Sequence, residues 1–189
     1  AKLFKPRNSL GNTGGQFYTA KNPEYGAVFT YNLNDVPKTS KSLRMQRERK
    51  LNTDNKDVPF PGYDKLANEM NEKPASIILT IKDSEGNHIR NIKKNASNGS
   101  SRIAWNLSHQ SYYPVRAGRG QSYLWFNPSG PYVTPGEYHA EIYLENNGSV
   151  EKLDGPIAFN VKPLRKGTLQ GASYNEYNSF RTRVSNLYV

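Results

Sequence analysis

The 189-residue sequence contains no cysteine, which removes disulfide bonds, cysteine-ligated zinc and a thiol nucleophile from its chemistry. Long apolar runs are missing too, because no stretch approaches the roughly 18 residues that a membrane-spanning helix needs. The sequence therefore predicts a chain without a membrane span.

Motifs of the common catalytic and metal sites are also missing. His88, His109 and His139 lie singly, so no HExxH or HxH spacing exists to hold a metal. No G-x-S-x-G motif occurs, and the glycines of GNTGG (11–15) lack the Lys-Ser/Thr pair of a phosphate-binding loop. The sequence nominates no catalytic residue, no metal ligand and no cofactor, and we expect a protein that is not an enzyme.

Apolar residues are few, and aromatic residues take over part of their role. Only 35% of the residues are hydrophobic and the mean hydropathy is −0.83, but 12% are aromatic, with 13 Tyr and 2 Trp. Because each aromatic ring buries a large area, a chain of this length can still form one domain with a core. The formal net charge of +10 favours an anionic partner such as nucleic acid, an acidic polysaccharide or a membrane surface.

Short segments of alternating apolar and polar residues recur along the chain and predict strands. In GEYHAEIYLE (136–145) the alternation predicts that Tyr138 and Ala140 face the core, while His139 and Glu141 face water. Similar segments occur at 27–33, 76–82, 89–92, 102–107, 150–153 and 157–164. Six to eight short strands without alternating long helices favour a mainly β fold, a two-sheet antiparallel β-sandwich.

The segment between two of these strands, Asp83 to Asn87, carries oxygen ligands at alternate positions, as a calcium loop does. It lacks the further carboxylate that an EF-hand places at its twelfth position. We therefore interpret it as the turn of a β-hairpin.

Residues 35–74 break the β pattern and predict a partly helical insertion. Thr39 and Ser40 are candidate caps before the basic stretch KSLRMQRERK (41–50), and Tyr63, Leu66, Ala67 and Met70 recur at helical spacing. Three cations of the basic stretch are candidate anion contacts: Lys41, Arg44 and Arg47. No aromatic residues are interleaved there, so nucleic acid is the less favoured partner, and a solvated helix face or a match to an acidic neighbouring domain is favoured.

An aromatic group in the segment 112–135 is the candidate contact surface for a ligand. Its members are Tyr112, Tyr113, Tyr123, Trp125 and Phe126. Such loop aromatics stack on sugars or anchor interfaces, which makes a glycan the candidate ligand. The alternative is that they are buried over one end of the sandwich.

The C-terminal segment 173–188 has the pattern of an amphipathic helix. Ser173 and Glu176 form a Ser-x-x-Glu capping box. An apolar stripe follows, consisting of Tyr174, Tyr177, Phe180, Val184 and Leu187. We expect this stripe to be buried within the domain or in a dimer, and the chain to end near an interface with further protein.

Two segments resemble a known family. NPEYGAVFTYNL (22–33) and KPASIILTIKDSEGNHIRNI (73–92) resemble the region C-terminal to the β-propeller in sortilin-type, BNR-repeat, glycosyl hydrolase-like bacterial proteins. The similarity continues in SSRIAWNLS (100–108), GPYVTPGEYHAEIYL (130–144) and GPIAFNVKPL (155–164). The resemblance implies an immunoglobulin-like accessory domain, similar also to that of flagellar hook-capping proteins, in a secreted, periplasmic or cell-surface protein. It implies the propeller of the same parent chain as a partner, and it brings no catalytic residues.

These observations divide the chain into three parts. We expect a linker or arm from a preceding domain at 1–21, an immunoglobulin-like antiparallel β-sandwich with its helical insertion at 22–165, and a C-terminal helical extension at 166–189. The expected function is that of a non-catalytic accessory and interaction module of a larger exported multidomain protein. A carbohydrate-binding module and a fragment of a glycoside hydrolase, which would need a carboxylate pair, are the alternatives.

Overall fold

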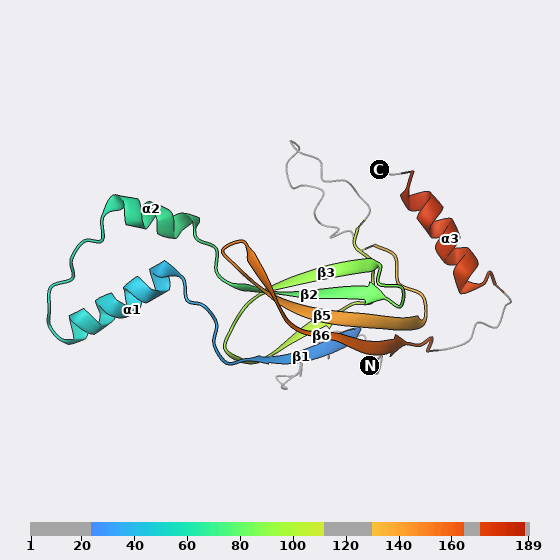
Figure 1. Cartoon of the computed structure of the whole chain (residues 1–189), viewed down its shortest axis with the longest axis horizontal. Helices are drawn as coiled ribbons and strands as arrows, with labels where there is room; N and C mark the ends of the chain where they lie inside the picture. Colours follow the sequence, from blue (N-terminus) through green and yellow to red (C-terminus); the bar gives the residue numbers. More distant parts are fainter. Residues whose placement is uncertain (1–23, 112–129, 165–170, 188–189) are drawn as a thin grey trace, which may run out of the picture.

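Two antiparallel sheets form the centre of the protein in a computed structural model that describes residues 24–111, 130–164 and 171–187 (Figure 1). One sheet pairs β1 (Ala27–Leu33) with β4 (Gly99–Trp105). The other has the order β3-β2-β5-β6. Its strands are β2 (Ser76–Asp83), β3 (His88–Asn95), β5 (Gly136–Asn146) and β6 (Ser149–Val161). The mainly β, sandwich-like architecture expected from the alternating segments is confirmed.

The core lies between the two sheets and is centred on Trp105. Its indole is fully buried, makes edge-to-face contacts with the rings of Tyr138 (5.6 Å between centroids) and Phe159 (6.0 Å), and donates from Nε1 to the Ser108 carbonyl at 3.0 Å. The alternation in β2 buries three side chains against this cluster, Ile77, Leu79 and Ile81. The apolar face predicted for this strand is therefore confirmed.

The turn after β2 uses the carboxylate of Asp83 to hold the backbone. Asp83 Oδ1 accepts the backbone N–H groups of Glu85 at 3.0 Å and Asn87 at 2.8 Å, in the manner of an Asx turn. The residues that could have formed a calcium loop thus close the β2–β3 hairpin, as the hairpin interpretation predicted.

Glu141 corrects one expectation from the sequence, because it is only 7% exposed although it lies on the face of β5 predicted to meet water. Its carboxylate is covered by its own partners. Lys82 Nζ lies 2.6 Å from Oε2, Lys152 Nζ lies 2.7 Å from Oε1, and the Tyr143 hydroxyl donates to Oε2 at 2.8 Å. Hydrogen bonds from Lys152, Lys82 and Tyr143 lower the pKa of Glu141 to about 2.

Replacement of Glu141 by Ala is expected to destabilise the fold by about 1–2 kcal/mol, less than the roughly 3–5 kcal/mol for a fully buried pair, because the freed lysines can turn to water. Glu145→Ala, which removes the partner of the half-exposed Lys93, is the matched control and should cost less than about 1 kcal/mol. Equal losses in urea unfolding would contradict this difference.

The same carboxylate makes stability depend on acid pH. Between about pH 4.5 and pH 2 the unfolded chain binds the Glu141 proton and the folded protein does not, so stability falls as the pH falls through this window. A Glu141→Gln variant should show a flatter decline there in the urea midpoint, whereas an unchanged slope would show that Glu141 does not contribute.

Ile157 is a second correction. The alternation in IAFNVKPL (157–164) places Ile157 on one face with Phe159 and Val161 and predicts that it is buried, but Ile157 is 54% exposed, while Val161 is buried. Ile157 lies on β6, which is an edge strand of its sheet and therefore has a neighbouring strand on one side only.

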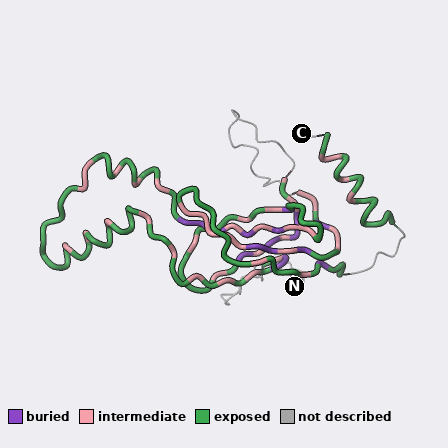
Figure 2. The backbone as a smooth tube through the Cα atoms, viewed as in Figure 1, coloured by how far each residue is buried: buried purple, intermediate pink, exposed green. Residues whose placement is uncertain are grey.

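Helices project from the sandwich rather than packing over its faces. α1 (Ser40–Thr53) and α2 (Tyr63–Asn71) extend together beyond one end, and α3 (Tyr174–Ser185) lies towards the other (Figure 1). Within the described ranges, the buried residues lie in the strands and in the segments next to them (Figure 2). Among the described residues, no helix is long and apolar enough to cross a membrane.

α3 forms as predicted, but its orientation differs from the expectation. The capping box of Ser173 and Glu176 is present. Tyr174, Tyr177, Phe180 and Leu187 are 53%, 46%, 64% and 83% exposed, and only Val184 of the stripe is half-buried. The predicted burial of this stripe within the domain is therefore wrong, while its burial in a dimer stays a prediction.

Polar residues on another side of α3 explain this orientation. Asn178 Nδ2 donates to Thr134 Oγ1 at 3.0 Å, and Arg181 Nη1 donates to the Tyr132 carbonyl at 2.9 Å. Arg181 Nη2 lies 2.7 Å from His109 Nε2, which must accept because a guanidinium only donates. Burial, together with Arg181, lowers the pKa of His109 to about 4, so the ring is neutral at pH 7. The helix thus attaches through hydrogen bonds and turns its aromatic side outward.

Candidate functional site: the helical arm

The helical arm, defined as residues 38–74, begins and ends at one closed base. Thr39 Oγ1 caps α1 by accepting the backbone N–H of Ser42 at 3.2 Å. The Ser40 N–H donates to Glu72 Oε2 at 2.7 Å, which joins the start of α1 to the residue that follows α2. The helical insertion and the cap predicted from the sequence are confirmed.

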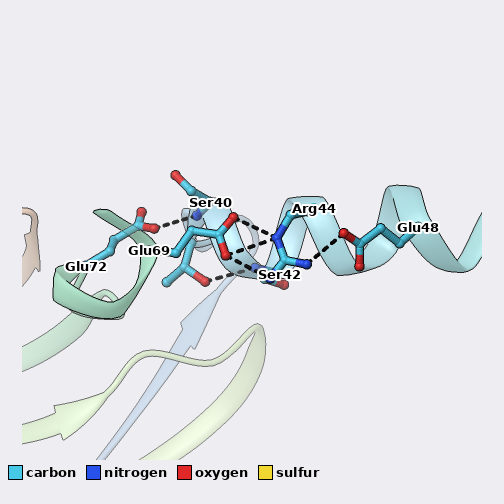
Figure 3. Close-up of polar contacts among 7 residues, drawn as sticks. Ser40, Ser42, Arg44, Glu48, Glu69 and Glu72 are labelled. Carbon is cyan, nitrogen blue, oxygen red and sulfur yellow. Dashed lines mark hydrogen bonds and ion pairs between the residues drawn. The ribbon is translucent and has the colours of Figure 1, made fainter. Parts of the chain in front are cut away.

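Arg44 holds the two helices together. Its Nε lies 2.9 Å and 3.0 Å from the two Glu69 carboxylate oxygens, its Nη2 lies 2.9 Å from Oε2 of Glu69, and its Nη1 lies 2.7 Å from Glu48 Oε1 (Figure 3). These bonds lower the pKa of Glu69 and raise that of Arg44, so both groups stay charged. Arg44 was a candidate anion contact, but its guanidinium already holds two carboxylates of its own chain.

Neither α1 nor α2 has a buried residue (Figure 2). α2 turns Lys65, Asn68 and Glu69 towards the groove between the helices, and leaves Tyr63 and Met70 of its apolar stripe 81% and 86% exposed. An amphipathic helix in a globular protein normally covers such a stripe against its core. In α2 the usual arrangement is reversed. Its polar side faces α1, and Tyr63 and Met70 of its apolar stripe face solvent.

An open groove of about 940 Å³ runs between the two helices. Apolar side chains from α1 and from the segment between the helices line it, among them Leu43, Leu51 and Phe60. Besides Arg44, one cation from each helix lines it, Arg47 on α1 and Lys65 on α2. The groove thus combines an apolar surface with a positive charge on each side.

α1 carries a large excess of positive charge. Five Lys and Arg residues against one Glu in its fourteen residues give a formal charge of +4. Lys41, Arg47, Arg49 and Lys50 have no carboxylate within ion-pair distance in the part of the chain that the structure describes. Two of the predicted anion contacts, Lys41 and Arg47, are therefore free to meet an external charge.

The other predicted site residues do not join this surface. The aromatic group Tyr112, Tyr113, Tyr123, Trp125 and Phe126 lies outside the described residues. The stripe of α3 lies at the opposite end of the sandwich from the arm (Figure 1). Sequence reasoning missed Phe60 and Glu69. The Arg44–Glu48 spacing of four residues signalled one half of the Arg44 contact, but nothing local signals its Glu69 half.

Replacing Arg44 by Met, which keeps the aliphatic stem, is expected to separate α1 from α2. Because no apolar core holds the arm, backbone amides of α1 should exchange with solvent much faster, while the melting temperature of the sandwich changes by less than about 2 °C. Arg49→Met removes a cation that has no partner and is the control. Unchanged exchange in Arg44→Met would contradict the role of Arg44.

Hydrogen bonds hold four of the described glutamates in their charged form. Lowered pKa values of Glu69, Glu141, Glu145 and Glu176 are the opposite of what a general acid for glycoside hydrolysis needs. Within the described ranges, no group of three or more His, Asp or Glu side chains could hold a metal ion.

Comparison of the chain with protein-family models, with curated proteins and with solved structures gives no match.

Proposed function

We propose that this chain is a non-catalytic interaction module, in which an immunoglobulin-like sandwich carries the helical arm as its binding element. The observation that supports this function is a fully formed pair of helices without one buried residue. Isolated helices of 14 and 9 residues are marginal in water, and an exposed apolar patch marks an interaction site. In a larger exported protein, the resemblance makes the rest of the parent chain, which carries the β-propeller, the natural partner.

The rigid sandwich suits this role because it fixes where the arm starts. α1 follows β1 after a short connection, and α2 leads directly into β2, whose inner face is fully packed. A partner that binds the arm is thereby brought to one end of the sandwich (Figure 1).

Hydrogen exchange of the full-length gene product tests this proposal. Amides of α1 and α2 should exchange at least tenfold more slowly there than in the isolated 189-residue chain, because the partner covers them. Amides of β2 provide the internal control, since the core protects them in both forms. Equal exchange of the arm in both forms would show that it does not dock within the parent protein.

A further inference from the structure

Resting on the proposed function, we infer that the arm binds an acidic amphipathic helix of a partner protein, with the apolar side of that helix on the groove between α1 and α2. The groove supplies apolar contacts from Leu43, Leu51 and Phe60, which are half-buried or exposed in the free chain. Helix binding in a groove uses apolar side chains repeating at three and four residues.

The charges of the groove and of α1 favour a negatively charged partner. The formal charges that line the groove cancel, with Arg44, Arg47 and Lys65 against Glu48, Glu69 and Glu72, so the excess positive charge at its edge comes from the other cations of α1, whose formal charge is +4. Glu48 and Glu69 are held by Arg44, and Glu72 accepts the N–H of Ser40. Arg47 and Lys65 have no ion-pair partner among the described residues, and the outer side of α1 adds further unpaired cations. Carboxylates flanking an apolar stripe complement this arrangement.

Two other occupants fit less well. A second copy would bring together two arms that each carry nine Lys and Arg against six Asp and Glu in residues 38–74, and this excess of like charge opposes the contact. A nucleic acid would use the cations through its phosphates, but it would leave the apolar lining of the groove exposed.

The length of α1 determines the length of the peptide that should be used to test this inference. The fourteen residues of α1 span about 21 Å, so a synthetic peptide of about 14 residues matches it. One peptide carries Leu at i, i+3, i+4 and i+7 and Glu on the other positions. A basic twin has Lys in place of Glu, and a shuffled acidic twin keeps the composition without the stripe.

The acidic striped peptide should bind the 189-residue chain at least tenfold more tightly than either twin in calorimetry, and the binding should weaken as salt is added. The double variant Arg47→Glu/Lys65→Glu should lose at least tenfold in affinity for it and gain affinity for the basic twin. Arg102→Glu/Lys162→Glu, which reverses two exposed charges on the sandwich, should bind like the unchanged chain.

Equal binding of the acidic and basic peptides, or of the striped and shuffled ones, would overturn the inference. Tighter binding of a duplex oligonucleotide, or self-association that Phe60→Ser abolishes, would overturn it in favour of the two occupants set aside above. If no peptide binds but the arm is protected in the full-length product, the proposed function stands and the acidic helix is wrong.

Discussion

Trp105→Ala is expected to destabilise the protein by about 3–5 kcal/mol, a large part of the stability of an ordinary domain. The indole is fully buried, contacts the rings of Tyr138 and Phe159 from the facing sheet, and bonds to the Ser108 carbonyl. Its removal leaves a cavity between the sheets and also removes the donor of a buried hydrogen bond. Urea unfolding followed by far-ultraviolet circular dichroism measures the loss.

Two further variants show how much of this loss comes from ring packing, from the Nε1 hydrogen bond and from the buried position of the ring. Trp105→Phe keeps much of the ring packing but loses the Nε1 donor, and it should cost about 1–2 kcal/mol. Phe60→Ala removes an aromatic ring that is 63% exposed on the arm, and it should stay within about 0.5 kcal/mol of the unchanged protein. A loss for Trp105→Ala no larger than that for Phe60→Ala would show that the core is not centred on Trp105.

Gly26→Ala should be at least as disruptive as the loss of many core side chains, at about 3 kcal/mol or more. Gly26 has φ of +111°, and a Cβ atom there would lie 1.9 Å from the Trp105 carbonyl oxygen and 2.8 Å from its carbonyl carbon. The neighbour is backbone, so no rotamer change relieves the clash. The start of β1 must then move away from β4, which breaks the pairing of Ala27 with Trp105.

Gly148→Ala is the matched control for this prediction. Gly148 also has a positive φ, +83°, but a Cβ atom there would meet nothing within 4 Å. Its substitution carries only the cost of the backbone conformation, about 1 kcal/mol. Similar urea midpoints for the two variants would mean that the close approach at Gly26 can relax.

Local patterns were enough to predict most of the elements. Alternation in SIILTIKD predicted the buried face of β2, and the Ser173–Glu176 spacing predicted the start of α3, because both signals lie within a few residues of one another. Helical spacing in the 63–71 segment likewise predicted α2.

Contacts between residues that are distant in the sequence determine which side chains are buried or paired, and local patterns could not predict these contacts. Glu141 is buried because Lys82 and Lys152 approach it from the two neighbouring strands, and Arg44 holds Glu69 from 25 residues away. In α3 the periodicity shows which residues share a side, but bonds from Asn178 and Arg181 to other segments decide which side docks. A contact of the same kind decides which cations of the arm are free to bind an anion. Arg44 was one of the three candidate anion contacts, but its ion pair with Glu69 occupies it.

The contact between Ser40 and Glu72 makes the arm an exchangeable part of the protein. The bond joins the two ends of the arm between β1 of one sheet and β2 of the other, and doubling the length of a loop costs only about 0.6 kcal/mol. Evolution can therefore lengthen, shorten or replace the arm, and with it the choice of partner, while the strands and their register stay the same.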